Sequence, residues 1–257
     1  MTQPAARCQR AAGFPPEAFG YLVEAEEGSF WFQARNRLIV WATKKYFPSA
    51  TTFLEVGCGT GYVLKGLAES VPSLKLAGCE LFEEGLLHAR ERLPDVPLSQ
   101  ADARDLPFHA EFDLAGAFDV LEHIDDDEAA LASLHDALVP GGGLLLTVPQ
   151  HPRLWSPADE YAEHQRRYTR TELCGKLERA GFKTLRVTSF VTLLLPLMVA
   201  SRTRERHREI HYEPAAEHQE AQRLQRPLSA AMATELWLIR HGVPLPVGGS
   251  LLAVAVR

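Results

Sequence analysis

The sequence predicts an α/β fold in which helices cover both faces of a doubly wound, mostly parallel sheet. From residue 52 onward, short apolar segments alternate with segments of helical periodicity, the pattern that builds parallel sheets. A glycine-rich turn follows the first apolar segment directly, within residues 53–63 (FLEVGCGTGYV). The 257 residues, 46% hydrophobic and 23% charged, are enough for one large domain with a sizeable core.

Two helices are predicted before the first strand. Residues 1–15 are rich in Ala and Pro, which indicates a loose terminus. Pro16 suits the first position of a short helix, and Ser29 suits the N-cap of a second helix over residues 30–47. The second helix carries too many aromatic residues for a solvated element. We therefore expect residues 1–50 to pack on the core and cap it.

Strands and helices are expected at regular intervals along residues 51–191, the predicted core. Apolar stretches predict strands at residues 52–56, 75–80, 96–100, 112–118, 143–148 and 183–190. Helical periodicity predicts helices at residues 62–69, 83–92, 126–138 and 171–180. The run at residues 138–143 (LVPGGG) predicts the end of a helix followed by a tight turn. Residues 250–257 are predicted to return to the core, with a final strand at 251–257.

Residues 192–249 form an unusually long connection before that last strand. They include a predicted helix at residues 229–241 and a basic run made of Arg202, Arg204, Arg206 and Arg208. We expect this insertion to form a lid over the substrate. The apolar stretch at residues 190–200 is too short to span a bilayer. With the arginines, it also fits a peripheral membrane contact, which is the alternative interpretation.

Charge and cysteine usage exclude several classes of protein. The formal net charge of −6 argues against a general nucleic-acid-binding protein, which usually has a basic excess. The four cysteines, Cys8, Cys58, Cys79 and Cys174, show no C-x-x-C pairing, so neither a zinc ribbon nor a disulfide framework is predicted. The first twenty residues contain no apolar run typical of a signal peptide. A cytoplasmic protein with reduced thiols is the expectation.

The glycine turn is the strongest local signal. Gly57, Gly59 and Gly61 occur at every second position between an apolar segment and a predicted helix. A backbone without Cβ atoms lets a ligand lie directly on the chain, and the amides of the helix N-terminus point at it. In a dinucleotide-binding turn, G-x-G-x-x-G, the third glycine would occupy the place of Tyr62. A nicotinamide-dependent dehydrogenase is therefore the less favoured alternative.

The turn reads E-x-G-x-G-x-G and resembles motif I of the class I S-adenosylmethionine-dependent methyltransferases. Three further stretches occur in the order that this family shows: Glu80 at the end of the second strand, residues 101–108 (ADARDLPF) and residues 112–124 (FDLAGAFDVLEHI). The resemblance covers about residues 53–187. It implies a seven-stranded sheet with its last strand antiparallel, and S-adenosylmethionine as the cofactor.

The resemblance also implies a set of cofactor-binding residues along these stretches: Glu55, Gly57, Cys58, Gly59, Gly61, Glu80, Leu81, Asp102, Ala103, Phe118 and Asp119. The glycines would wrap the methionine moiety, and Glu55 would reach its amine through water. Glu80 would accept the ribose hydroxyls, and Asp102 the adenine amino group. We also expect Trp31 and Arg35, in the preceding helix, to help close the cofactor pocket.

Methyl transfer is an in-line displacement at an activated sulfonium carbon, so the enzyme mainly positions the acceptor and excludes water. The favoured acceptor is a hydroxyl oxygen of a small molecule. A base would help to remove its proton, and histidine is the side chain best suited to that role. Three histidines lie at or after predicted strand ends, and each is a candidate catalytic residue: His123, His151 and His164.

A metal ion is not predicted. The stretch from Asp119 to His123 (DVLEH) resembles the E-x-x-E-H segment of the ubiquinone-pathway O-methyltransferases, where two carboxylates and a histidine can hold magnesium. Its first acid is one methylene shorter here, and magnesium prefers oxygen ligands. His123 is therefore expected to act as a base or a structural histidine. His207 and His211 stand four residues apart but lack the glutamate of H-E-x-x-H, so we expect a solvated face there.

The predicted loop at residues 148–169 concentrates polar and aromatic side chains where a substrate would enter. Trp155, Arg167 and Tyr168 are candidate substrate contacts, and the H-x-R-R-Y-T pattern resembles one found in a subset of these methyltransferases. Alternatively, Arg167 and Tyr168 anchor the loop to the following helix. A cofactor-binding module without catalysis is a further alternative for the whole chain. The sequence leaves the acceptor and the oligomeric state open.

Overall fold

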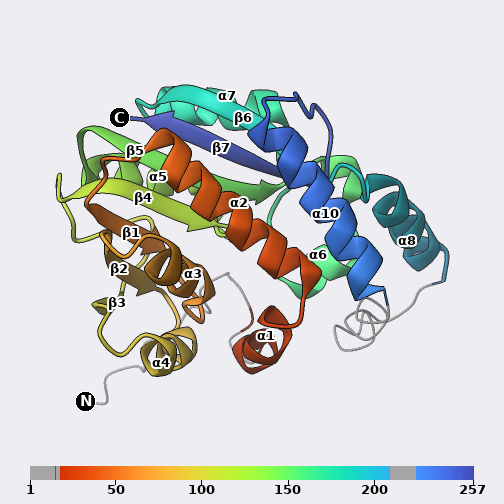
Figure 1. Ribbon diagram of the computed structural model, residues 1–257, viewed down its shortest axis with the longest axis horizontal. Coiled ribbons are helices and arrows are strands. Elements are labelled where there is room, and N and C mark those ends of the chain that lie inside the picture. The colour runs from red at the N-terminus through yellow and green to blue at the C-terminus, as the bar shows by residue number, and fades with distance from the viewer. Residues whose placement is uncertain (1–14, 16–17, 209–223) are drawn as a thin grey trace, which may run out of the picture.

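The computed structural model describes residues 15, 18–208 and 224–257, and shows one sheet between two layers of helices (Figure 1). The sheet has seven strands in the order β3-β2-β1-β4-β5-β7-β6. Strand β7 pairs antiparallel with β5 and β6, whereas the remaining pairs are parallel. The predicted fold class is confirmed, including the antiparallel last strand.

Most predicted elements are present close to their expected positions. The strands are β1 (Thr52–Val56), β2 (Lys75–Glu80), β3 (Leu98–Gln100), β4 (Phe112–Phe118), β5 (Leu138–Pro149), β6 (Lys183–Phe190) and β7 (Ser250–Val256). The helices are α1 (Ala18–Glu26), α2 (Phe30–Tyr46), α3 (Tyr62–Ser70), α4 (Glu83–Arg92), α5 (Asp127–Ala137), α6 (Pro157–Tyr161), α7 (Arg170–Arg179), α8 (Leu195–Arg208) and α10 (Gln225–Arg240). Two short 3-10 turns are η1 (Leu121–His123) and η2 (Pro152–Leu154).

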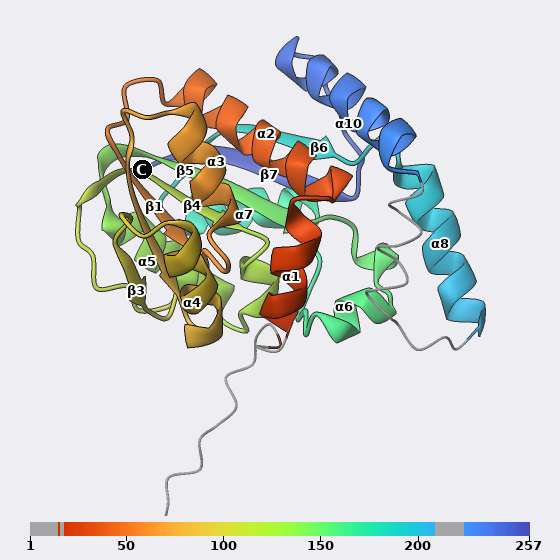
Figure 2. The ribbon, with the colours of Figure 1, turned by 60° about the horizontal axis from the view of Figure 1, so that its bottom comes forward.

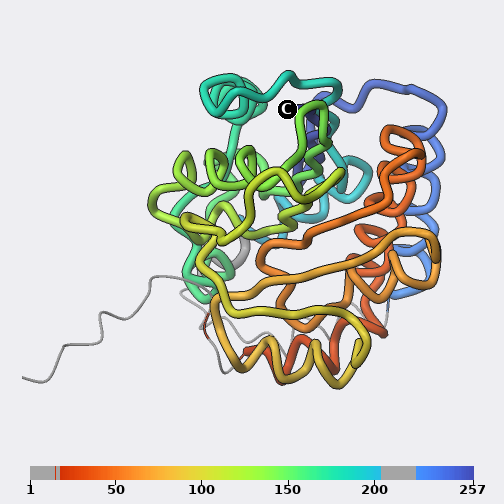
Figure 3. Tube along the Cα trace, turned by 90° about the vertical axis from the view of Figure 1, so that its left-hand side faces the viewer, coloured from red at the N-terminus to blue at the C-terminus, as the bar shows by residue number. Residues whose placement is uncertain are grey.

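Successive strand residues point into opposite helical layers, because side chains alternate across a strand. Phe53 of β1 belongs to the core on the side of α2, α3 and α10, where it joins Ile39 and Leu64. Leu54, the next residue, belongs to the core on the side of α5 and α7, where it joins Leu131. Figure 3 shows α2 and α5 on opposite sides of the strands. Both faces are therefore covered, which explains the nearly continuous apolar strands.

The glycine-rich run at residues 138–143 differs from its prediction. Helix α5 ends at Ala137, and β5 begins at Leu138 rather than after a tight turn. The pairing of β4 with β5 shifts between Phe112 and Leu114, so that Leu114 pairs with Gly143. Gly141 has a φ of +80° within this irregular stretch. The glycines that suggested a turn therefore lie in an irregular, bulged part of β5.

The N-terminal helices largely follow the predictions. The Ser29 side chain accepts a hydrogen bond from the Trp31 amide and caps α2. Helix α1 begins at Ala18, whereas Pro16 and residues 1–14 lie outside the described residues. Figure 2 shows α1 and α6 at the same end of the sheet, the end toward which the parallel strands run. These helices therefore lie where an α/β sheet binds its ligands.

The insertion at residues 192–249 contains α8 and α10. Helix α10 packs against α2, and its residues Met232, Leu236 and Ile239 join the core. Residues 209–223, with His211, lie outside the described residues, as do the side chains of Arg204, Arg206 and Arg208. Within the described part of the chain, we find no helix with the length and apolar character needed to cross a bilayer.

Candidate functional site

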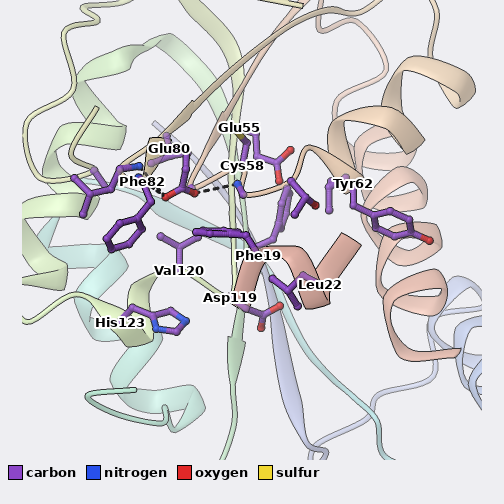
Figure 4. Close-up of a pocket in the computed structure, with 18 of the residues that line it drawn as sticks. Phe19, Leu22, Glu55, Cys58, Tyr62, Glu80, Phe82, Asp119, Val120 and His123 are labelled. Carbon is purple, nitrogen blue, oxygen red and sulfur yellow. Dashed lines mark hydrogen bonds between the residues drawn. The ribbon is translucent and has the colours of Figure 1, made fainter. Parts of the chain in front are cut away.

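A cavity of about 270 Å³ lies at the carboxyl ends of β1, β2 and β4. It is lined by residues of α1 and α2, by the glycine turn, and by the segments that follow β2, β3 and β4. Figure 4 shows Glu55 and Glu80 on one side of it and Asp119 and His123 on another. Phe19 of α1 lines the space between them. The cavity therefore has two ends, which differ in how they are built.

The glycine turn forms the wall of one end. Gly57, Gly59 and Gly61 have φ values of +69°, +51° and +77°, a region that favours glycine. A Cβ atom built on Gly57 would lie 2.5 Å from Cγ2 of Val120, whereas one on Gly61 would meet Leu93 at 3.2 Å. Gly57 and Gly59 line the cavity, but Gly61 does not. Gly61 therefore allows α3 to pack against α4, while the other two shape the cavity.

Glu80, at the end of β2, is held by three backbone amides. Its Oε2 accepts from the Gly59 amide at 3.0 Å, and its Oε1 accepts from the amides of Leu81 and Phe82 at 2.8 and 3.1 Å. Burial raises the pKa of Glu80, and the hydrogen bonds oppose that shift. A carboxylate has further lone pairs beyond these bonds. Glu80 can therefore accept hydroxyl groups from a ligand in the cavity.

Two buried side chains, one acidic and one basic, lie nearby, and each has one atom without a hydrogen-bond partner in the described part of the chain. Among the described residues, neither Oε2 of Glu55 nor Nε of Arg35 has a hydrogen-bond partner. Burial raises the pKa of Glu55 well above its usual value. Arg35 of α2 forms an ion pair with Asp119, and its guanidinium lies 4.6 Å from the ring centre of Trp31. Both residues line the cavity. Oε2 of Glu55 could accept a hydrogen bond from the amine of an amino acid, and Nε of Arg35 could donate one to its carboxylate.

The stretch after β3 contributes a charged rim. Oδ2 of Asp102 lies 2.7 Å from Nη2 of Arg104, and Nη1 of Arg104 lies 3.0 Å from Oδ1 of Asp125. The hydrogen bond from Arg104 holds the pKa of Asp102 below its usual value. Asp102 and its neighbour Ala103 both line the cavity. The sequence placed these two residues at the site but did not anticipate Arg104 between two carboxylates.

The opposite end of the cavity holds two histidines. His123 of η1 and His164, in the loop after α6, have ring centres 4.7 Å apart in an edge-to-face arrangement. Burial lowers the pKa of His123 to about 3, so this imidazole is neutral at ordinary pH. The Gln165 amide donates to the Glu122 carbonyl at 2.6 Å, which ties the two segments together. Glu122, His123 and His164 can each place one ligand atom within 4.8 Å of the others.

His164 is oriented by a buried carboxylate. Its Nδ1 lies 2.9 Å from Oδ1 of Asp159 in α6. Asp159 is 1% exposed, and it also accepts from Nε of Arg167 at 2.7 Å and from the Ser156 amide at 2.9 Å. These contacts hold the pKa of Asp159 below its usual range despite its burial. Because an ionised carboxylate only accepts hydrogen bonds, Nδ1 of His164 donates to Asp159, and in the neutral form of the ring the lone pair is on Nε2.

Several predicted site residues lie away from the cavity. Arg167 and Tyr168, expected to contact substrate, are buried instead. Nη1 of Arg167 donates to the Gln150 carbonyl at 3.2 Å, and the Tyr168 hydroxyl donates to Asp127 at 2.6 Å. The structure therefore corrects that expectation in favour of the anchoring role, because both side chains satisfy buried acceptors. His151 and Trp155, a base candidate and a substrate candidate, also lie outside the lining.

The remaining predicted residues all line the cavity: Trp31, Arg35, Glu55, Gly57, Cys58, Gly59, Glu80, Leu81, Asp102, Ala103, Phe118, Asp119, His123 and His164. Residues 1–50 were expected to cap the core, but the sequence did not single out any residue of α1, whose Phe19, Leu22 and Glu26 also line the cavity. Glu26 is buried and binds Arg92 at 2.8 Å and the Thr60 hydroxyl at 2.6 Å. Glu26 is one of two glutamates in an otherwise largely apolar helix, which was the available signal for this contact. None of the described residues of 192–249 lines the cavity, so a lid there stays a prediction.

Comparison with known proteins decides the family. The family described as "Methyltransferase domain" matches residues 24–187, more than half of the chain. The chain belongs to the class I S-adenosylmethionine-dependent methyltransferases. Two features of the cavity suit such a cofactor: Gly57 and Gly59 place no Cβ atom on its wall, and Oε2 of Glu55 and Nε of Arg35 have no hydrogen-bond partner among the described residues. Membership in this family rules out the alternative interpretation of the chain as a nicotinamide-dependent dehydrogenase.

Individual relatives are similar over part of their length. The chain is 34% identical over 128 residues to a dTDP-3-amino-3,4,6-trideoxy-α-D-glucopyranose N,N-dimethyltransferase of Streptomyces venezuelae, covering 48% of this chain and 53% of the relative. It is 35% identical over 147 residues to the O-methyltransferase cnsE of Penicillium expansum, covering 52% and 53%. The chain thus spans about half the length of these curated relatives.

A solved structure shows the same fold over nearly the whole chain. The [4+2]-cyclase SpnF superposes with a TM-score of 0.62 at 19% identity, covering 96% of this chain and 98% of the cyclase. At this level of identity the similarity concerns the fold alone. Methyltransferases that act on nitrogen and on oxygen are both among the relatives. The acceptor atom must therefore be argued from the site.

Proposed function

We propose that this protein transfers a methyl group from S-adenosylmethionine to a hydroxyl oxygen of a small-molecule acceptor. The observation that supports it is the single cavity that joins the glycine turn and Glu80 to the pair His123 and His164. One end then binds the cofactor, and the other faces the acceptor. A small molecule suits a cavity of about 270 Å³ because part of that volume is taken by the cofactor.

Some residues of the cavity bind the cofactor, and others exclude water. Glu80 binds the ribose hydroxyls, while Glu55 and Arg35 bind the amine and carboxylate of the methionine moiety. Phe19 and Leu22 of α1 cover the cavity and exclude water from the reacting atoms. S-adenosylmethionine itself supplies an activated methyl group on a sulfonium. The remaining requirement is to orient the acceptor oxygen, which we assign to the histidine end.

The histidine end favours an oxygen acceptor because imidazole nitrogens hydrogen-bond well to a hydroxyl group. His123 and His164 are both at the cavity, whereas His151 is not. The three candidate histidines are thereby reduced to two. An amine acceptor is the second candidate, since one relative is named as an N,N-dimethyltransferase. The carboxylates of Asp119 and Asp125, which also line the cavity, could hold an ammonium group.

Binding and turnover experiments test this function in sequence. Calorimetric titration with S-adenosylmethionine, S-adenosylhomocysteine and NAD is expected to show binding of the two adenosyl ligands only. Methyl transfer from radiolabelled S-adenosylmethionine is then measured on matched pairs of acceptors that carry a hydroxyl or an amino group on the same ring or sugar. Faster labelling of the hydroxyl member supports the proposal, and preference for the amine rejects it. Tight binding without labelling of any acceptor favours a non-catalytic module.

A further inference from the structure

We propose that Glu122, His123 and His164 form a binding site for a divalent metal ion of the zinc class, with its open position facing the acceptor end of the cavity. The site deepens the proposed function, on which only the role of the open position depends. The ligand set differs from the acidic one that the sequence resemblance implied. It combines η1 with a loop far along the chain, and only the tertiary structure brings these segments together.

The geometry supplies three ligand atoms in one place. One carboxylate oxygen of Glu122 and one nitrogen from each of His123 and His164 lie within 4.8 Å of one another. Ligand atoms about 2.0–2.2 Å from a zinc ion would lie closer together than this limit. Metal binding would therefore draw the three side chains together by rotation about their torsions. The edge-to-face arrangement of the two rings, with centres 4.7 Å apart, keeps them side by side.

Glu122 is the observation that points to a cation. Its side chain is 0% exposed, and neither carboxylate oxygen has a hydrogen-bond partner among the described residues. Buried carboxylates are rarely left in this state, because the group loses its hydration without compensation. Nearby Arg35 is already paired with Asp119. A bound cation would compensate the buried carboxylate through direct ligation.

The residues around the three ligands match the outer shell of a metal site. His164 donates from Nδ1 to Asp159, the carboxylate–histidine arrangement that orients ligating imidazoles. Asp159 is itself fixed by Arg167 and by the amide and hydroxyl of Ser156. The nitrogen of His164 that remains for a metal is therefore Nε2. The hydrogen bonds that orient His164 through Asp159 are thus formed in the absence of a metal ion.

The donor set selects the class of metal. Two imidazoles and one carboxylate suit zinc and its neighbours in the transition series, whereas magnesium and calcium prefer oxygen ligands. Asp119, the first acid of the DVLEH segment, is bound to Arg35 and accepts from the Thr147 hydroxyl at 3.1 Å. Asp119 is therefore not one of the proposed metal ligands. Three protein ligands leave a position open, and His123 and His164 both line the cavity.

Metal titration of the full chain tests the site without any knowledge of the acceptor. The purified protein is freed of metal with a chelator, dialysed, and titrated with Zn²⁺ by calorimetry and with Co²⁺ by visible absorption. We expect one ion per chain and the intense d–d bands of a four- or five-coordinate cobalt. We also expect that excess Mg²⁺ does not displace it. Mass spectrometry of the native protein checks the stoichiometry.

Single substitutions that remove one ligand atom each assign the ligands. Glu122→Gln, His123→Asn and His164→Asn are each expected to weaken Zn²⁺ binding by more than about tenfold, and Asp159→Asn by about 10–100-fold through loss of orientation. Glu160→Gln, an exposed acid beside Asp159, and His241→Asn, an exposed surface histidine, are the matched controls. The controls are expected to bind Zn²⁺ as the unaltered chain does. Circular dichroism and S-adenosylmethionine titration of each variant verify that it has folded.

The outcomes separate this inference from the proposed function. Absence of stoichiometric Zn²⁺ and Co²⁺ binding by folded protein would reject the metal site, whatever the result of S-adenosylmethionine titration. Binding that survives in Glu122→Gln and His164→Asn would also reject it, because surface histidines would then be the ligands. Stoichiometric binding that these variants lose would establish the site even if no acceptor were methylated.

Discussion

Backbone groups form the cofactor end of the cavity, whereas side chains form its acceptor end. At the cofactor end, the positive-φ glycines Gly57 and Gly59 and the amides that bind Glu80 come from the turns after β1 and β2. At the acceptor end, His123 and His164 come from segments that are joined through the Gln165 amide and supported by Asp159. Backbone geometry tolerates little substitution, while side-chain positions can be exchanged without altering the chain path. The first end suits a constant cofactor, and the second suits a variable acceptor.

The largest expected effect is at the backbone of the cofactor end. Gly57→Ala should reduce S-adenosylmethionine affinity by more than about 100-fold, because a new Cβ would lie 2.5 Å from Val120 Cγ2 and its positive φ costs about 1–2 kcal/mol. Calorimetry measures the affinity. Gly141→Ala is the matched control, since Gly141 has a φ of +80° and nothing within 4 Å of the built Cβ. Equal affinities in both variants would show that the backbone at Gly57 does not determine cofactor binding.

A smaller loss is expected when a side chain of the cofactor end is changed. Glu80→Gln should weaken S-adenosylmethionine binding by about 10–100-fold, because it replaces a charged acceptor by a neutral amide that must also meet three backbone donors. Glu83→Gln, an exposed acid three residues further along, is the control. Titration of the two variants in parallel gives the difference. A Glu80→Gln protein that binds normally would remove Glu80 from the site.

The pH dependence of cofactor binding should be weaker still. Burial raises the pKa of Glu80, so acidification protonates it sooner than a solvated glutamate. The protonated form stabilises the free folded protein, and that contribution is lost as pH rises through the folded-state pKa. Cofactor binding has the opposite sign, because the ribose needs the carboxylate.

We therefore expect S-adenosylmethionine affinity to fall by about threefold or more on lowering the pH from about 7.5 to about 5.5. The measurement is calorimetry at a series of pH values, with Glu80→Gln titrated alongside. Glu80→Gln should show a flatter profile than the unaltered chain, since one titrating carboxyl is gone. An unchanged slope would assign the dependence to another group, with Glu55 the first to examine because its pKa is also raised.

The smallest effect on cofactor affinity is expected at the acceptor end. His164→Asn should leave S-adenosylmethionine affinity within about twofold while reducing methyl transfer, because His164 lines the cavity at the end that we propose for the acceptor. Binding and single-turnover assays on the same protein separate the two quantities. Loss of cofactor affinity comparable to that of Glu80→Gln would show that the two ends are not separate.

The prediction of the strand, glycine turn and helix start was confirmed, because a short stretch of chain encodes this structure. Residues 53–63 contain a strand, a turn and a helix start whose conformation depends on glycine, so their geometry follows from local chemistry. Alternating apolar segments likewise determine the strands, since a buried parallel sheet needs them. The tight turn predicted for LVPGGG was wrong, because a glycine-rich sequence permits a bulged strand as well as a turn.

The acceptor end depends on contacts between distant segments, and these carry no local signature. Arg167 and Tyr168 stood in an expected entry loop, yet the fold buries them against Gln150 and Asp127. Glu122 was one residue of a short motif until the structure showed it buried and unpartnered beside His164. The sequence by itself determined the fold class, the family and the glycine turn, because periodicity and glycine geometry are local. Only the tertiary structure decided which side chains meet, since burial and pairing depend on the whole chain.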